Sequence, residues 1–142
     1  PVQSPRPPII VGGGGLKRTP MFAAKYADEF NRAFRQIPEF VDLCGRVRAA
    51  CESIGRDPNE LVYSVGQVVC VGRNAAELSA RAARIGRDLD DLRENGLAGL
   101  PDEVVAKMQA WRDAGAQRLY FQVLDLDDLD HLDLIAELTT RI

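Results

Sequence analysis

The chain has 142 residues and a mass of 15.6 kDa, with 46% hydrophobic and 27% charged residues. This composition is typical of a globular domain and excludes a disordered or fibrous chain. No apolar run approaches the roughly 20 residues that a membrane-spanning helix needs, and the proline-rich start lacks the apolar core of a signal peptide. Three cysteines without a CxxC spacing predict reduced thiols in a cytoplasmic protein.

The net charge of −3 is unevenly distributed along the chain. Residues 1–50 contain 8 Lys and Arg against 4 Asp and Glu, whereas residues 51–142 contain 10 against 17. The balance is too acidic for a general nucleic-acid-binding protein, which presents a basic face. We therefore expect no nucleic-acid partner. The early basic excess lies close to the one motif that could hold an anion.

The predicted elements begin with a lead-in at residues 1–7, where prolines prevent regular pairing. Residues 8–11 form a short β-branched run, which predicts a strand buried on both faces. Glycines at 12–15 end this strand. Thr19 is then expected to cap the first helix, with Pro20 at its first position.

The rest of the chain continues the alternation of strands with helices. Runs rich in β-branched residues indicate the strands, whereas apolar residues at helical spacing, capping residues and glycine stops indicate the helices. Further strands are predicted at residues 28–31, 61–71 and 119–124. Helices are predicted at residues 19–26, 38–54, 74–85, 87–95, 101–114 and 127–141.

This order predicts an α/β fold with right-handed crossovers and a parallel sheet. Four strand–helix units in 142 residues correspond to half of a TIM-type (β/α)8 barrel, in which about 250 residues make eight units. A small open doubly wound sheet is the alternative, and the periodicity does not separate the two. We expect one domain at residues 8–142 after the lead-in at 1–7.

The strongest local signal is a strand followed by four glycines and a helix. At the carboxyl end of a parallel strand, glycines let backbone N–H groups approach a phosphate, and the helix adds the positive end of its dipole. The spacing matches neither standard nucleotide motif, and a turn chosen for tight packing is the alternative. The residues of this predicted anion site are Gly12, Gly13, Gly14, Gly15, Lys17, Arg18 and Thr19.

Polar residues at other strand ends are candidates for the substrate side of a site. Asn31 and Gln122 lie at or near predicted strand ends and Asp125 follows the last strand, where α/β barrels place ligand contacts. A solvated loop and a satisfied sheet end are the alternatives for the first two. The acidic run at 125–133 lacks the glycine and late glutamate of a calcium loop. We therefore interpret it as a helix start capped by Asp127, and expect no metal site.

Histidine-based nucleophilic catalysis is disfavoured. The only histidine lies within the acidic run, far in sequence from the cysteines, and a Cys–His or Ser–His pair needs the base beside the nucleophile.

Five segments, in the same order along the chain, resemble the C-terminal part of luciferase-like flavin and deazaflavin oxidoreductases. They are residues 6–15 (RPPIIVGGGG), 23–31 (AAKYADEFN), 46–58 (RVRAACESIGRDP), 97–105 with 113–115 (LAGLPDEVV and DAG) and 122–131 (QVLDLDDLDH). The last segment is similar to the closing strand and helix of actinobacterial-type members that use coenzyme F420. The resemblance covers essentially the whole chain.

The resemblance implies strands five to eight of a (β/α)8 barrel, beginning at residue 8. It also implies hydride transfer between a substrate carbon and reduced FMN or the deazaflavin F420. The backbone after strand five holds the cofactor phosphate in such enzymes, which corresponds here to Gly12, Gly13 and Gly14. Their acid–base residues lie on strands one to four, which this chain does not match, so the catalytic residues are unknown.

Three functions follow as hypotheses. The first is the cofactor-binding half of an F420- or FMN-dependent oxidoreductase with a small-molecule substrate, not catalytic alone. The second is a non-catalytic half-barrel that self-associates or binds a partner half, because open strand edges and exposed apolar surface favour association. The third is a doubly wound phosphosugar or nucleotide binder, which predicts a strand order with a switch point.

Overall fold

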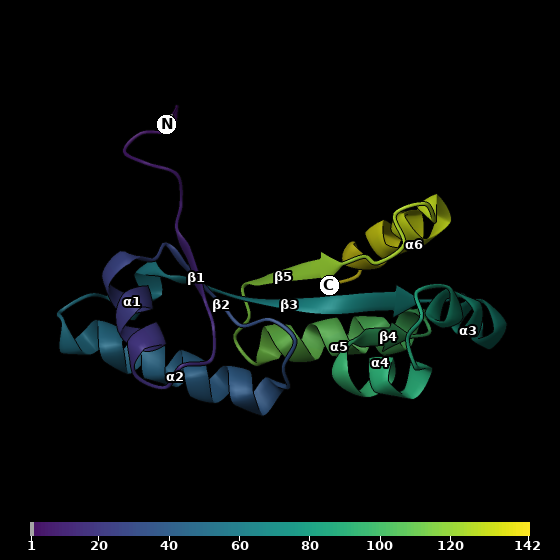
Figure 1. The fold of residues 1–142 in the computed structure, drawn as a ribbon, viewed down its shortest axis with the longest axis horizontal. Helices are drawn as coiled ribbons and strands as arrows, with labels where there is room; N and C mark the ends of the chain where they lie inside the picture. The colour runs from purple at the N-terminus through teal and green to yellow at the C-terminus, as the bar shows by residue number, and fades with distance from the viewer. Residues whose placement is uncertain (1) are drawn as a thin grey trace. The chain divides into compact units, whose positions relative to one another are not determined.

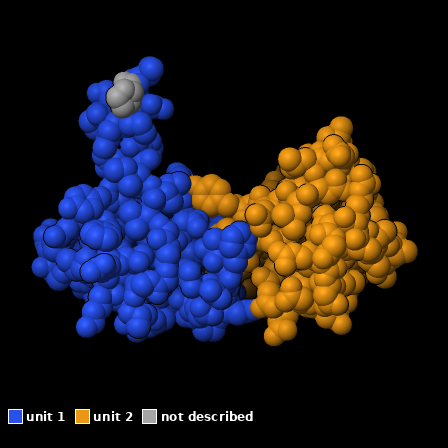
Figure 2. All heavy atoms as spheres, in the orientation of Figure 1, with its two compact units in different colours: residues 1–65, 115–118 blue, residues 66–114, 119–142 orange. Residues whose placement is uncertain are grey.

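A computed structural model of the chain describes residues 2–142, which divide into two compact units (Figure 2). Unit 1 contains the described residues up to Val65 together with Gly115–Arg118. Unit 2 contains Gly66–Ala114 and Leu119–Ile142. The longest strand contributes its first residues to unit 1 and the rest to unit 2.

Unit 1 is built from parallel strands and two helices that pack against one another (Figure 1). Strand β1 pairs with β2, and β2 pairs with the start of β3, both in parallel. The elements are β1 (Ile10–Gly12), α1 (Arg18–Tyr26), β2 (Glu29–Asn31), α2 (Ile37–Ser53), the 3-10 helix η1 (Pro58–Glu60) and the start of β3 (Val62–Val71).

The two faces of this small sheet differ in chemistry. Successive strand residues point to opposite faces, and Phe30 and Tyr63 are register partners on one of them. Both are fully buried, and Arg48 of α2 lies 4.3 Å from the centre of the Tyr63 ring. This face therefore forms the apolar core with the helices. The opposite face carries the polar residues Glu29 and Asn31.

Unit 2 contains the remainder of β3 and four helices. Strand β3 pairs in parallel with β4, with Val69 opposite Leu97 and Val71 opposite Gly99, and β5 also pairs with β3. The elements are α3 (Ala75–Arg84), α4 (Leu89–Asn95), β4 (Leu97–Gly99), α5 (Pro101–Asp113), β5 (Arg118–Gln122) and α6 (Leu129–Thr139). The apolar cluster beneath β3 and β4 contains Val68, Cys70, Leu78, Ala82, Leu92 and Ala98.

The predicted alternation of strands and helices is confirmed, and the fold is α/β with parallel strands. Strands β1, β2 and β3 neighbour one another in sequence order, without the reversal that a doubly wound sheet has at its switch point. Strand β4 was not predicted, because three residues between a helix and a proline give no periodicity to detect. The division between a lead-in at 1–7 and a domain at 8–142 stays a prediction, and Pro1 lies outside the described residues.

Three local expectations were wrong. Strand β1 is not buried on both faces: Ile10 is 52% exposed, because β1 ends the strand order and pairs only with β2. Helix α1 begins at Arg18 with Lys17 as its N-cap, so Thr19 does not cap it and Pro20 is not its first residue. The last helix is capped by Asp128 rather than Asp127.

The three cysteines are buried. Cys44, Cys51 and Cys70 are free and buried, and burial raises the pKa of the Cys44 thiol to about 12. Within residues 2–142, none of the helices is both long enough and apolar enough to cross a membrane.

Candidate functional site

The glycine loop and Asn31 lie at the same edge of the unit 1 sheet. Gly12 is the last residue of β1 and Asn31 the last of β2, and the two are register partners. Because the strands are parallel, their carboxyl ends share one edge, where α/β proteins bind ligands. The structure thus brings together the first glycine of the predicted anion site and one of the predicted substrate-side residues.

The loop needs glycine at Gly13 and brings two polar side chains close to Gly14 and Gly15. Gly13 has a φ of 124°, a conformation that side chains rarely adopt. A Cβ on Gly15 would stand 2.7 Å from Thr19 Oγ1, and one on Gly14 would stand 3.0 Å from Arg32 Nη2. A hydroxyl and a guanidinium therefore approach a main chain that carries no side chains.

The N-terminus of α1 adds donors to the same loop. Lys17 makes no side-chain capping hydrogen bond, and the first turn contains no acidic residue. The N–H groups of a first turn have no intrahelical acceptor and form the positive end of the helix dipole. Lys17 and Arg18 are exposed beside this turn, and the Thr19 hydroxyl lies against the glycine loop instead of capping the helix.

Arg32 is a site residue that the sequence did not single out. Its backbone N–H donates to the Ser64 carbonyl oxygen at 3.0 Å, and its side chain is only 16% exposed. Glu39 Oε2 lies 3.7 Å from Arg32 Nη2, so the guanidinium also forms an ion pair with this carboxylate. A guanidinium is permanently charged and suited to phosphate. Its position directly after the strand-end residue Asn31 is the signal that could have identified it.

Phe34 lies in the loop that follows β2. Among residues 2–142, Phe34 is the only non-glycine residue with a positive φ, which is 56°. It is 51% exposed. A left-handed backbone costs a residue with a Cβ roughly 1–2 kcal/mol, and such strain gathers at functional sites. No sequence pattern marks this position.

Behind the sheet edge lies a buried polar cluster. Ser64 Oγ donates to Glu29 Oε1 at 2.5 Å, and Asn31 Nδ2 donates to Ser64 Oγ at 2.8 Å. Arg118 Nη1 donates to Glu29 Oε2 at 2.6 Å. The Glu29 side chain is 3% exposed, so this carboxylate is held inside the protein by an ion pair and a hydroxyl.

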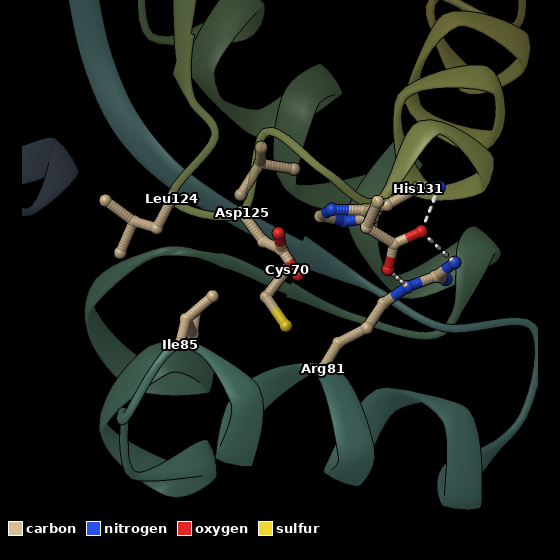
Figure 3. Close-up of a pocket in the computed structure, with 8 residues that line it drawn as sticks. Cys70, Arg81, Ile85, Leu124, Asp125 and His131 are labelled. Carbon is tan, nitrogen blue, oxygen red and sulfur yellow. Dashed lines mark hydrogen bonds and ion pairs between the residues drawn. The ribbon is translucent and has the colours of Figure 1, made fainter.

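The other two substrate-side candidates belong to unit 2. Gln122 is the exposed last residue of β5. Asp125 forms an ion pair with Arg84, with Nε 2.6 Å from Oδ2, and its Oδ1 accepts the Asp127 N–H at 3.1 Å. Asp125 also lines a cavity of about 10 Å³ beside Cys70 and His131 (Figure 3). This volume admits about one water molecule and no organic ligand.

The single histidine has a structural role. His131 is buried, and its Nε2 accepts the Val71 N–H at 3.0 Å. Burial, and then the nearby positive charge of Arg81, lower its pKa. Arg81 in turn pairs with Asp128 (Figure 3). Its Nη1 also donates to the Val71 carbonyl oxygen. Within residues 2–142, no group of three or more His, Cys, Asp or Glu side chains is placed to hold a metal ion.

Comparisons with solved structures identify the fold. One similar structure is the F420-dependent tetrahydromethanopterin reductase from Methanopyrus kandleri, with 14% identity and a TM-score of 0.68. The match covers 90% of this chain and 48% of the reductase chain. An F420-dependent secondary alcohol dehydrogenase, solved with an F420–acetone adduct, matches 92% and 47%, with 11% identity and a TM-score of 0.74. A riboflavin lyase, solved with modified FMN and riboflavin, matches 93% and 42%, with 12% identity and a TM-score of 0.65.

These likenesses show the fold and its extent. The chain has the same α/β fold as part of these three proteins and corresponds to half of a TIM-type barrel, as predicted. It spans less than half the length of each of the three proteins. No protein-family model matches the sequence, and no curated protein is significantly similar to it.

Proposed function

We propose that this chain is the cofactor-binding part of an F420- or FMN-dependent oxidoreductase, and that the glycine loop holds the cofactor phosphate. The observation that carries the proposal is the convergence of Arg32 and the Thr19 hydroxyl on residues 13–15. The uncapped start of α1 adds backbone donors beside them. Positive charge, a hydroxyl and free N–H groups are the groups that bind a phosphate.

The neighbouring structures support the choice of cofactor. Two of them depend on F420 and the third contains modified FMN. Both cofactors carry a phosphate at the end of a ribityl chain, so the same loop suits either. When bound, such a cofactor supplies hydride transfer to or from a small-molecule substrate. The residues of this chain bind and orient it.

We propose further that this chain does not catalyse hydride transfer alone. The support is that this chain spans less than half the length of each of the three similar structures. Of the polar groups at the loop edge, the Glu29 carboxylate is buried, is paired with Arg118 and accepts the Ser64 hydroxyl.

A flavin titration tests the phosphate assignment. Bound FMN is expected to lose fluorescence, and Gly13→Val should abolish that quenching because valine cannot adopt a φ of 124° and fills the loop. Gly86→Val is the matched control, since Gly86 also has a positive φ of 65° but meets open space. The same titration with F420 shows which cofactor binds more tightly. Unchanged FMN affinity in Gly13→Val, with the control unaffected, would remove the glycine assignment.

A second candidate function is self-association or binding of a partner half. Strand β1 ends the strand order, and Ile9 and Ile10 are 39% and 52% exposed. An unpaired strand edge with apolar side chains favours pairing with another chain. Sedimentation should show association without cofactor, weakened by Ile10→Lys. A monodisperse monomer with a two-state thermal transition would contradict this candidate.

A further inference from the structure

Four residues of unit 1, joined by three successive hydrogen bonds, form a relay that ends beside the glycine loop. It runs from Arg118 to Glu29, from Glu29 to Ser64, and from Ser64 to Asn31, with donor–acceptor distances of 2.6, 2.5 and 2.8 Å. Asn31 is the register partner of Gly12. The chain of hydrogen bonds therefore reaches from a buried carboxylate to the edge where the glycine loop begins.

The direction of every bond in this relay is fixed by its chemistry. Both oxygens of the Glu29 carboxylate accept, one from Arg118 and one from Ser64. A serine hydroxyl has a single proton, and the Phe30 carbonyl at 3.4 Å is also only an acceptor for it. Ser64 Oγ must therefore accept from Asn31. This requires the NH₂ side of the amide, so the Oδ1 side remains for a ligand.

We infer that Asn31 is a ligand-binding residue whose Oδ1 accepts a hydrogen bond from a hydroxyl of a phosphorylated polyol chain, and that Glu29 and Ser64 are positioning residues for it. The inference rests on the proposed function, in which the phosphate lies on residues 13–15. The ligand atoms nearest a bound phosphate are those of the chain that carries it, and Asn31 borders the first residue of that loop. An acceptor at this position suits a hydroxyl and disfavours a second anionic oxygen.

Two flavins separate hydroxyl recognition from phosphate recognition. FMN carries a phosphoribityl chain, and the matched probe carries a phosphopentyl chain with the same ring and phosphate but no hydroxyls. In the unmodified protein FMN should bind about fivefold more tightly than the phosphopentyl flavin, the effect of one net hydrogen bond. Asn31→Ala should remove this preference and leave the affinity for the phosphopentyl flavin unchanged. Ser64→Ala should reduce the same preference, because the Asn31 amide is no longer held.

Ser64→Ala tests the direction of the relay without a ligand. The alanine removes the Oγ that accepts the Asn31 NH₂, so this NH₂ loses its acceptor. The side-chain N–H signals of Asn31, identified by their loss in Asn31→Asp, should then lose protection from exchange with water. Glu39→Gln, which changes a carboxylate near Arg32 and outside the relay, should leave them unchanged.

The outcomes distinguish the inference from the proposed function. If the unmodified protein does not bind FMN, the proposed function and this inference both fail. If FMN binds but Asn31→Ala and Ser64→Ala weaken both flavins equally, the cluster is only structural and this inference alone is overturned. Unchanged Asn31 signals in a folded Ser64→Ala protein would also overturn it.

Discussion

The guanidinium of Arg32 lies against Gly14, so close that a Cβ on this glycine would stand 3.0 Å from Nη2. The two residues come from successive strand–helix loops, one after β1 and the other after β2. The register of Gly12 with Asn31 holds these loops side by side. A permanent positive charge is therefore placed on a bare main chain, which is the arrangement that a phosphate requires.

Arg32→Gln is expected to weaken FMN binding by about tenfold or more, because a charge-assisted hydrogen bond contributes roughly 1.5–3 kcal/mol. Isothermal titration of the variant measures the loss. Arg35→Gln is the matched control, since Arg35 lies in the same loop with a side chain that is 53% exposed. Equal losses in the two variants would assign the effect to general electrostatics rather than to Arg32.

Thr19→Val is expected to weaken FMN binding by about fivefold, whereas Thr19→Ser should retain it, because only the hydroxyl is a hydrogen-bond donor. The hydroxyl lies next to the glycine loop and does not cap α1. Thermal stability should accordingly change little in either variant. A large loss of stability in Thr19→Val, with FMN affinity unchanged, would show that the hydroxyl supports the helix instead.

Phe34→Gly is expected to keep or raise stability while it weakens FMN binding. Relief of the left-handed backbone should raise the free energy of unfolding by roughly 1–2 kcal/mol. The greater backbone entropy of glycine in the unfolded chain should lower it by about 0.5–1 kcal/mol. The exposed Phe34 ring follows β2 at the edge that carries the glycine loop, and we expect it to stack on the flavin ring. Loss of such stacking removes roughly 1–3 kcal/mol of binding. Phe34→Ala separates the two effects, because it loses the ring but keeps the strain. A lower melting temperature for Phe34→Gly than for Phe34→Ala would contradict the assignment of strain.

His131 should make stability depend on pH below neutrality. Its pKa in the folded protein is lowered, mainly by burial and then by Arg81, whereas the unfolded chain titrates near 6.5. The unfolded chain therefore binds the proton first, and stability is full above pH 6.5 and declines as the pH falls toward the folded pKa. Urea unfolding of His131→Gln should lack this decline, since Gln accepts the Val71 N–H without titrating. A decline of equal size in both proteins would assign it to other groups.

The order of the elements other than β4 could be predicted because each of them carries a local signal. Asn74 and Glu77 mark the start of α3, and Asn74 Oδ1 does accept the Glu77 N–H at 3.0 Å. The exposure of Ile10 could not be predicted, since it depends on how many strands flank β1 and not on the residues of β1 itself.

Part of the candidate site could be predicted, because some of its residues also carry a local signal in the sequence. Four glycines after a strand are visible in the sequence, and so is a polar residue at the end of the next strand. The approach of Arg32 to Gly14 depends on the register between β1 and β2, which three-residue strands do not encode locally. Glu29 was overlooked because a charged residue at a strand start is usually exposed, and its partner Arg118 is 89 residues away.

The comparison of FMN with riboflavin tests most directly whether the glycine loop is a phosphate site, because the two ligands differ only in the phosphate. Titrated under the same conditions, FMN is predicted to bind at least about tenfold more tightly, and Gly13→Val should make the two affinities equal. Equal affinities in the unmodified protein, or a preference for FMN that persists in Gly13→Val, would contradict the account.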